Sequence, residues 1–359
     1  MNPPDKFSPR LIAFEVTRTC YLNCEHCRAR ADMRKREGEL SESEIKRILD
    51  SIASFSSPII ILTGGEPMAR EDIFKIASYG SGIGLKMVMA VCGTFIDSES
   101  IGKIMKAGIK RISFSIDGAV KETHDSIRGV PGAFDNILKA ARLSSSRGLE
   151  FQINTTVFKK NANELPRILE LAVNLGAVSF HPFMLVPTGR GKNLTKLEIS
   201  PEGYENILKW IYEQSGRTPI LFKPTCAPHY QRILRQNRAH AAETTSLHTG
   251  VGTLDRLSRG CMGGQSFAFI SHTGKVQMCG FLDVEAGALR AENYDFRKIW
   301  ENSLFFRELR DVVNYKGKCG YCEYKNICGG CRARAYGVSG DYMDEEPYCV
   351  YTPAVKAGR

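Results

Sequence analysis

Short apolar runs alternate with helical stretches from residue 11 to about residue 190, and this alternation constrains the fold more than any other feature. The runs predict six strands at residues 11–18, 58–64, 85–91, 110–117, 149–157 and 178–186. Helical patterns lie between them at residues 41–55, 97–108, 132–148 and 163–176. Six strand–helix repeats with apolar strands indicate an α/β fold, in which helices cover a parallel sheet. Right-handed crossovers would curl the sheet into a partial (β/α)6, TIM-like barrel; a doubly wound open sheet is the alternative.

The sequence changes character near residue 260. Residues 191–259 are less regular, with a helix predicted around residues 203–214 and a loop predicted at residues 237–260. Residues 260–359 hold seven of the twelve cysteines and one further predicted helix at residues 296–313. We therefore expect a barrel in residues 1–190, a connecting or lid region in residues 191–259, and a small metal-organised domain in residues 260–359.

Composition limits the class of protein. The chain has 359 residues, of which 43% are apolar, and no apolar run approaches the ~18 residues of a membrane helix. Its first residues lack the apolar core of a secretory signal, so we expect a cytoplasmic protein whose cysteines are metal ligands rather than disulfides. The net charge of +10 fits a solvated basic surface, an anionic substrate, an acidic electron donor or nucleic acid. Thiolate-bound clusters would offset part of that charge.

Three cysteines, Cys20, Cys24 and Cys27, follow the first predicted strand within eight residues. Barrels of this kind carry their chemistry at the carboxyl ends of the strands. A structural zinc site closes with four ligands, so three thiols indicate a metal centre with one open position. A zinc site that lacks a ligand is the alternative.

The second predicted strand ends in Gly64-Gly65-Glu66-Pro67, and together with the three cysteines this resembles the radical SAM superfamily. The resemblance implies a radical SAM barrel with a [4Fe–4S] cluster, whose fourth iron binds S-adenosylmethionine (SAM) while the GGEP backbone contacts the SAM amino group. It implies further SAM contacts at His26, Ser115, Asp117, Arg128 and Asn154. An ordinary strand-end turn at Ser115 and a surface arginine at Arg128 are the alternatives.

The C-terminal cysteines resemble the SPASM domain, an addition to radical SAM barrels that binds auxiliary [4Fe–4S] clusters. The resemblance implies a distal cluster on Cys319, Cys322, Cys328 and Cys349. It implies a proximal cluster on Cys261, Cys279 and Cys331, for which Cys226 is the candidate fourth ligand. Two residues separate Cys328 from Cys331 in "CGGC", whereas three residues are usual at this place in the SPASM pattern. One or two auxiliary clusters fit this pattern, and a zinc ribbon is the alternative. The remaining cysteine, Cys92, fits a buried core position.

Longer stretches, including "KPTCAPHY" and "GGQSFAFISHTGKVQMCGFL", resemble the SPASM enzymes of siroheme-dependent heme biosynthesis. Because Cys279 is present, the chain resembles the heme b synthases within that group, which convert two propionates of iron-coproporphyrin III into vinyl groups with loss of carbon dioxide. Candidate anchors for the substrate carboxylates are Arg190, Lys192, Lys223, Arg232, Arg332 and Arg334. Candidate neighbours of the porphyrin iron are His181, His229 and His272.

Other functions stay open at this point. A related enzyme acting on siroheme-derived or nitrite-reductase heme precursors and a peptide-modifying SPASM maturase use the same motifs. An iron–sulfur electron carrier and an RNA-modifying enzyme are weaker alternatives, and we expect no nucleic-acid partner. The resemblance also implies a low-potential electron donor, a ferredoxin or flavodoxin, whereas the sequence does not determine the oligomeric state.

Overall fold

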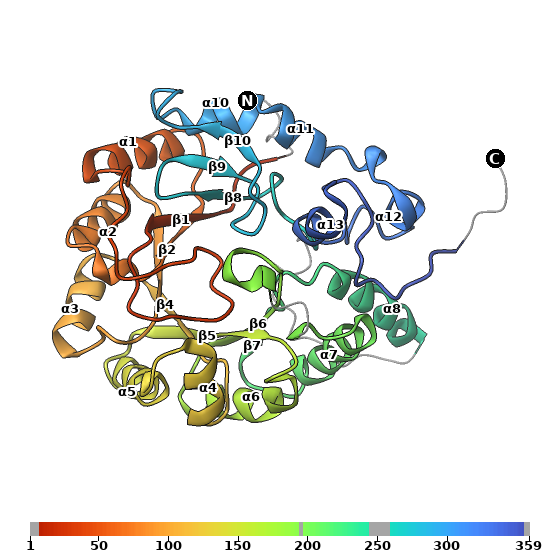
Figure 1. Cartoon of the computed structure of the whole chain (residues 1–359), viewed down its shortest axis with the longest axis horizontal. Coiled ribbons are helices and arrows are strands. Elements are labelled where there is room, and N and C mark those ends of the chain that lie inside the picture. Colours follow the sequence, from red (N-terminus) through yellow and green to blue (C-terminus); the bar gives the residue numbers. More distant parts are fainter. Residues whose placement is uncertain (1–6, 194–196, 244–258, 355–359) are drawn as a thin grey trace.

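The computed structural model describes residues 7–193, 197–243 and 259–354. Its centre is one sheet of ten strands in the order β10-β9-β8-β1-β2-β3-β4-β5-β6-β7 (Figure 1). The strands are β1 (Leu11–Thr17), β2 (Ile59–Gly64), β3 (Lys86–Val91), β4 (Arg111–Ser115), β5 (Glu150–Val157), β6 (Ser179–Met184), β7 (Leu221–Phe222), β8 (Phe267–Ile270), β9 (Lys275–Gln277) and β10 (Glu285–Ala288). The run from β1 to β7 pairs in parallel throughout, which confirms the predicted α/β class and the six predicted strands.

Helices cover the outside of this curved sheet (Figure 1). They are α1 (Glu42–Ala53), α2 (Ile73–Gly82), α3 (Ser98–Lys106), α4 (Lys121–Arg128), α5 (Ala133–Ser146) and α6 (Leu165–Asn174). A capping box begins α1, because Ser41 and Glu44 exchange side-chain and backbone hydrogen bonds. The sequence patterns did not predict α2 or α4. The latter is mostly polar and buries only three of its residues, so it lacks a clear apolar stripe.

Alternation along the strands gives the barrel an apolar outer face and a polar inner face. In β5, Phe151, Ile153 and Val157 belong to the main hydrophobic core. The residues between them, such as Gln152 and Asn154, are half-buried and lie on the opposite face. The carboxyl ends of the strands therefore surround polar side chains suited to a site.

The residues after 260 join the barrel sheet. β8 pairs in parallel with β1, and β9 and β10 follow as antiparallel strands, so the cysteine-rich region is continuous with the barrel. The predicted helix at residues 296–313 is two helices, α10 (Phe296–Asn302) and α11 (Leu304–Arg310), because the extended backbone of Ser303 separates them. Two more helices, α12 (Gly317–Tyr321) and α13 (Arg332–Ser339), carry or adjoin the last cysteines.

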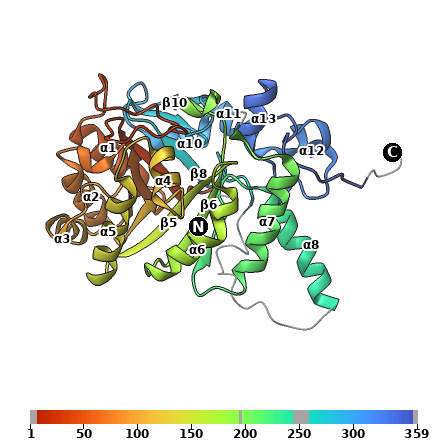
Figure 2. The same ribbon diagram turned by 60° about the horizontal axis from the view of Figure 1, so that its bottom comes forward.

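Two helices form the connecting region. α7 (Pro201–Ser215) and α8 (His229–Glu243) pack side by side below α12 and α13, as Figure 2 shows. The loop predicted at residues 237–260 is wrong at its start, because α8 continues to Glu243. Its central part, residues 244–258, lies outside the described residues.

Candidate functional site

The loop after β1 brings Cys20, Cys24 and Cys27 together. Its small apolar cluster has the buried members Cys20, Leu22, Cys24, Ala29, Ala31 and Ala133, and Cys27 packs against it. The Leu22 N–H donates to Cys20 Sγ at 3.4 Å, and the Ala31 N–H donates to Cys27 Sγ at 3.4 Å. Burial raises the pKa of the Cys20 thiol to about 12 and also raises the pKa of Cys24. Thiolates in such surroundings need adjacent positive charge, so these residues fit a bound iron centre.

The Gly64–Pro67 segment fixes this loop to the sheet. A Cβ atom on Gly64 would lie 2.1 Å from the Thr17 carbonyl oxygen, and one on Gly65 would lie 2.3 Å from the Thr19 carbonyl oxygen. The Gly65 and Glu66 N–H groups donate to those same two oxygens at 2.8 Å. Only glycine permits this approach, so the segment extends the β1–β2 pairing into the cysteine loop.

The side chain of Glu66 is fully buried and is used within the protein. Its two oxygens accept hydrogen bonds from the backbone N–H groups of Met68 at 2.9 Å and Cys92 at 2.6 Å. Cys92 lies one residue beyond β3 and packs against the apolar cluster of Cys20 and Cys24. The predicted core cysteine is therefore a neighbour of the site, and the contact of Glu66 with SAM stays a prediction.

Arg128 reaches the same site from the end of α4 and is buried. Its Nη1 donates to Cys24 Sγ at 3.7 Å, and its Nη2 lies 2.7 Å from Asp117 Oδ2. The other Asp117 oxygen accepts the Thr156 N–H at 2.8 Å. Arg128 is thus no surface arginine, and Asp117 acts by holding it in place.

His26 faces the same carboxylate. Its Nε2 lies 3.6 Å from Asp117 Oδ2, while Nδ1 is buried without a hydrogen-bond partner in the described chain. Burial lowers the pKa of His26 to about 4, although Asp117 opposes that shift. The ring is therefore neutral near pH 7 and presents an orphaned nitrogen, as a residue that contacts a bound cofactor would.

Ser115, the last residue of β4, is the register partner of Asn154 in the middle of β5. Both are half-buried, and the Asn154 carbonyl accepts the Ile116 N–H at 2.9 Å. The Asn154 side-chain oxygen accepts from Gln152 Nε2 at 2.9 Å. The structure thus places both predicted SAM contacts on the inner face beside Asp117, and their contact with SAM stays a prediction.

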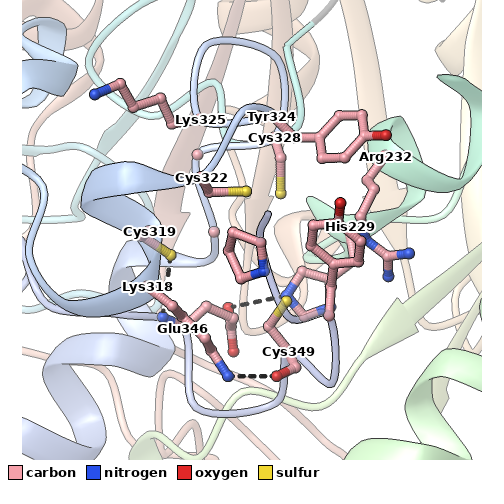
Figure 3. A pocket seen from close by; sticks show the side chains of 14 residues that line it. His229, Arg232, Lys318, Cys319, Cys322, Tyr324, Lys325, Cys328, Glu346 and Cys349 are labelled. Atoms are coloured by element: carbon pink, nitrogen blue, oxygen red, sulfur yellow. Dashed lines mark hydrogen bonds and ion pairs between the residues drawn. The ribbon is translucent and has the colours of Figure 1, made fainter. Parts of the chain in front are cut away.

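Four of the C-terminal cysteines line one cavity, shown in Figure 3. They are Cys319, Cys322, Cys328 and Cys349, the four predicted to hold the distal cluster. Cys319 Sγ accepts hydrogen bonds from the Glu346 N–H at 3.4 Å and from Arg332 Nη2 at 3.8 Å. Burial raises the pKa of the Cys322, Cys328 and Cys349 thiols. This donor set, with cationic and N–H groups aimed at sulfur, fits an iron–sulfur cluster.

A second group contains Cys226, Cys261, Cys279 and Cys331. Burial raises the pKa of Cys279 to about 12 and of Cys331 to about 11, and the neighbouring thiols of the group add to both shifts. Burial also raises the pKa of Cys226 well above its usual range, and the other three thiols again contribute. The structure therefore brings Cys226 to the three cysteines it was predicted to complete.

Backbone contacts hold Cys226 in this place. Its backbone is left-handed, with φ of 55°, and its carbonyl accepts hydrogen bonds from Arg334 Nη2 at 3.2 Å and from the Tyr204 hydroxyl at 3.0 Å. Gly260 fits closely beside it, because a Cβ atom there would lie 2.7 Å from Pro228. The turn that carries Cys226 is thus packed against the segment that leads to Cys261.

The buried pair Arg334 and Glu346 joins the two C-terminal groups, and the sequence patterns did not indicate it. Arg334 Nη1 lies 3.1 Å from Glu346 Oε1, and the Cys331 N–H donates to Glu346 Oε2 at 2.6 Å. Because the Glu346 N–H donates to Cys319 Sγ, one residue contacts a cysteine of each group. Both residues are at most 1% exposed, so the pair is a fixed internal link.

Four of the predicted carboxylate anchors make contacts inside the protein, and their contact with a substrate carboxylate stays a prediction. Arg190 donates to the carbonyls of Cys24 and Ala31, both at 2.8 Å, and so clamps the first cysteine loop. Arg232 is paired with Glu205. Arg332 donates to the Asp344 carbonyl at 2.6 Å, and Arg334 is held as described above. Lys192 and Lys223 are more exposed, and their role stays a prediction.

The three histidines predicted near a porphyrin iron lie in different places. His272 Nδ1 lies 2.7 Å from Glu15 Oε1 and belongs to a buried polar network. His229 lines the cavity of the distal cysteines. His181 lies on β6 with Nδ1 3.3 Å from Gln152 Nε2, on the inner face of the barrel.

Arg28 connects the two regions, and the sequence analysis did not single it out. It follows Cys27, its Nη2 lies 2.6 Å from Glu15 Oε2, and its guanidinium stacks over Phe269 at 4.5 Å. A Cβ atom on Gly280 would lie 2.9 Å from its Cδ, so the side chain also touches the residue after Cys279. Arg28 therefore spans from the first cysteine loop to the second C-terminal group.

Two kinds of feature are absent from the described residues. Within residues 7–193, 197–243 and 259–354, no three His, Cys, Asp or Glu side chains are placed to hold a single metal ion. No helix in those same ranges is long and apolar enough to cross a membrane.

Comparison with known proteins now adds to this geometry. The Radical SAM superfamily matches residues 14–172, which include the first cysteine loop and the GGEP segment. A protein of Methanosarcina barkeri named AdoMet-dependent heme synthase is 49% identical over 97% of this chain and 98% of its own length. The chain belongs to the radical SAM superfamily, in the group of AdoMet-dependent heme synthases. It is therefore a SAM-dependent radical enzyme with a [4Fe–4S] cluster.

Two further comparisons concern a more distant relative in sequence and a neighbour in fold. The Fe-coproporphyrin III synthase of Methanosarcina barkeri is 28% identical to this radical SAM chain over 95% of the chain. SuiB from Streptococcus suis, in a crystal structure with bound S-adenosylmethionine, superposes with a TM-score of 0.74 over 96% of this chain and 78% of SuiB. Because identity to SuiB is only 16%, that likeness shows the fold alone.

Proposed function

We propose that this radical SAM enzyme oxidatively decarboxylates two propionate side chains of iron-coproporphyrin III to vinyl groups and so produces heme b. The observation that carries the proposal is the grouping of Cys279 with Cys226, Cys261 and Cys331. Enzymes of the same group that trim siroheme or build the nitrite-reductase heme tend to lack a cysteine at that position. The name of the heme synthase relative supports the same reaction.

The reaction needs both a radical and an electron acceptor. When bound, the cluster and SAM supply a 5′-deoxyadenosyl radical that takes one hydrogen atom from the propionate β-carbon. Each propionate carboxylate then releases carbon dioxide and one electron and leaves a vinyl group. Two propionates therefore require two SAM molecules and an acceptor for two electrons in turn.

We infer that Cys20, Cys24 and Cys27 hold the SAM cluster, as the superfamily pattern implies. The residues that would hold SAM are His26, Gly64, Gly65, Glu66, Pro67, Ser115, Asp117, Arg128 and Asn154. Asp117 has its oxygens engaged by Arg128 and Thr156, so we assign it the role of fixing Arg128. Arg128 places positive charge beside Cys24, which favours the thiolate.

We infer two auxiliary [4Fe–4S] clusters, since each C-terminal group offers four thiols. Cys319, Cys322, Cys328 and Cys349 would hold the distal cluster. Cys226, Cys261, Cys279 and Cys331 would hold the proximal one, which adjoins Arg28 and the first cysteine loop. We infer that the proximal group, rather than the distal one, would take the electron from the substrate.

We assign a substrate carboxylate to Arg28. Its guanidinium lies between the loop that would bind SAM and the loop of Cys279, and its ion pair with Glu15 occupies one nitrogen. Arg18 and Arg28 together place two positive charges against the one carboxylate of Glu15. A substrate carboxylate would balance the remaining charge.

The same proposal covers the rest of the protein. We place the radical-generating core in residues 1–190, the connecting region in residues 191–259 and the auxiliary domain in residues 260–359. The enzyme would work in the cytoplasm and take electrons from a low-potential donor, a ferredoxin or flavodoxin. The alternatives are a related reaction on a siroheme-derived or nitrite-reductase heme precursor, and peptide modification.

Anaerobic incubation of the reconstituted enzyme with SAM, a reductant and iron-coproporphyrin III tests the proposal. We expect 5′-deoxyadenosine and a porphyrin that has lost carbon dioxide from two propionates, both detected by mass spectrometry. Formation of 5′-deoxyadenosine with unchanged porphyrin would overturn the heme assignment. Parallel incubations with a siroheme-derived precursor decide between the related reactions.

A further inference from the structure

His229 is a buried histidine whose ring lacks hydrogen-bond partners. It begins α8, is 1% exposed, and lines the cavity of the distal cysteines together with Glu346 (Figure 3). Neither Nδ1 nor Nε2 makes a hydrogen bond with any described residue. Glu346 Oε2 lies 3.9 Å from Nε2, which is too far for a hydrogen bond, and the Tyr204 ring packs edge-on at 4.9 Å.

An unpaired imidazole in such a place is costly. The ring carries at least one N–H in either protonation state, and a buried donor without a partner costs about 1–3 kcal/mol. Two other buried histidines of the described residues are paired: His124 Nδ1 accepts the Asp117 N–H at 3.1 Å, and His272 contacts Glu15. His26, the other histidine with a buried orphaned nitrogen, lies at the predicted SAM site. Orphaned imidazole nitrogens thus occur at two of the places where a cofactor is expected.

The neighbours of His229 do not supply the missing acceptor. Glu346 is held by the Cys331 N–H and by Arg334, so its carboxylate is fixed away from the ring. Arg232 and Lys318 also line the cavity, but their side chains only donate hydrogen bonds. The remaining acceptors include the four cysteine sulfurs and the group that they hold.

We propose that His229 donates a hydrogen bond to a sulfur atom of the iron–sulfur cluster held by Cys319, Cys322, Cys328 and Cys349. This inference rests on the proposed function, which places a cluster in that cavity. A hydrogen bond to sulfur stabilises the reduced, more negative cluster and so raises its reduction potential. His229 is then a positioning residue that sets how readily the distal cluster accepts an electron.

The test is an EPR-monitored redox titration of the full chain. A background with Cys20, Cys24 and Cys27 changed to Ala leaves only the auxiliary clusters, and the signal lost in Cys322→Ala identifies the distal one. His229→Leu removes the donor, whereas His229→Asn and His229→Gln keep an amide N–H near the position of Nδ1 or Nε2. Tyr324→Phe changes another side chain of the same cavity and serves as the matched control.

We expect His229→Leu to lower the ratio of reduced to oxidised distal cluster at least tenfold at a fixed potential, a shift of about 59 mV for one electron. One of the two amide variants should restore most of that ratio, with iron content unchanged in all variants. An unchanged ratio at full iron content would overturn the inference. Loss of the distal iron in all three His229 variants would also overturn it, by showing a ligand or packing role.

The proposed function fails in a different way. If Cys322→Ala removed neither iron nor an EPR signal, the cavity would hold no cluster, whatever the His229 variants did.

Discussion

The two cysteine-bearing regions of the enzyme are built in opposite ways. The barrel places three cysteines on one loop of eight residues, and that loop is fastened by backbone contacts to Gly64 and Gly65. The C-terminal region gathers eight cysteines from residues 226–349, and it depends on buried side chains such as Arg334 and Glu346. The first arrangement is local in sequence and is supported by main-chain contacts and by the side chain of Arg190, while the second is assembled from distant segments.

This difference separates the tasks that we assign to the two regions. A local loop with an open position suits a cofactor that binds and is cleaved in each cycle. Two closed groups of four thiols suit electron transfer, in which the ligands need not exchange. Arg28 joins the two regions, so a substrate held there would touch both.

The largest expected effect is loss of the radical-generating step. Cys24→Ala should reduce 5′-deoxyadenosine formation by at least about a thousandfold, because the SAM cluster loses one of three ligands. The iron of the auxiliary groups should remain, as measured by iron and sulfide content. Cys92→Ala is the matched control, since its thiol neighbours the same apolar cluster but is not a predicted ligand. Loss of all iron in Cys24→Ala would show that the two regions are not independent.

The second prediction concerns the side chains that assemble the C-terminal region. Arg334→Met leaves Glu346 buried and unpaired, so we expect a loss of about 3–5 kcal/mol in unfolding free energy. Denaturant titration measures this change. The double variant Arg334→Met/Glu346→Leu should recover part of it, because the unpaired charge is removed. Equal instability of the single and double variants would contradict the role of the pair.

The third prediction tests the backbone support of the barrel loop. Gly65→Ala places a methyl group against the Thr19 carbonyl oxygen. We expect the free energy of unfolding to fall by about 1–3 kcal/mol and SAM binding to weaken. Calorimetric titration with SAM checks the binding. Gly102→Ala is the control, because a Cβ there meets nothing within 4 Å and the helix should gain stability. Normal SAM binding by Gly65→Ala would refute the close approach.

The fourth prediction concerns the residue that joins the regions. Arg28→Ala should raise the KM for iron-coproporphyrin III about tenfold, since a charge-assisted hydrogen bond is worth about 1.5–3 kcal/mol. Arg28→Lys should show a smaller rise, because it keeps the charge but not the planar fork. Arg34→Ala removes an arginine whose side chain is 77% exposed and should leave KM unchanged. A KM equal to that of the wild type in Arg28→Ala would exclude the carboxylate contact.

The smallest expected effect is a pH dependence from Glu15. Burial raises the pKa of this carboxyl, but Arg28, His272 and Arg18 together hold it well below its usual range. Its contribution to stability is therefore complete above the unfolded value of about 4.3 and is lost as the pH falls below that. We expect the free energy of unfolding of the wild type to exceed that of Glu15→Gln by about 1–2 kcal/mol near pH 7 and by less below about pH 4.

Denaturant midpoints across this pH range measure the difference. Glu37→Gln, at an exposed position, should give a profile parallel to that of the wild type. A difference in denaturant midpoint between wild type and Glu15→Gln that stays constant with pH would contradict the assigned ion pairs.

Local features were predictable from the sequence, and distant partnerships were not. Strand periodicity placed β1 to β6, because that signal lies within short segments, whereas the grouping of the cysteines came from the resemblance to the radical SAM and SPASM patterns. The internal contacts of the arginines could not be predicted, because a guanidinium finds its acceptor through the fold. Arg190 holds the carbonyls of Cys24 and Ala31, which lie about 160 residues earlier in the chain. The pairing of β8 with β1 could not be predicted for the same reason, since it joins distant segments and no local pattern indicates it.

The measurement that tests the division of tasks most directly is the coupling of the two half-reactions in Cys279→Ala. Both 5′-deoxyadenosine and vinyl product are counted in one anaerobic reaction with iron-coproporphyrin III. The account predicts that 5′-deoxyadenosine still forms at a rate close to that of the wild type, whereas vinyl product falls at least about tenfold. Equal loss of both, or full retention of both, would contradict the assignment of electron acceptance to the C-terminal cysteines.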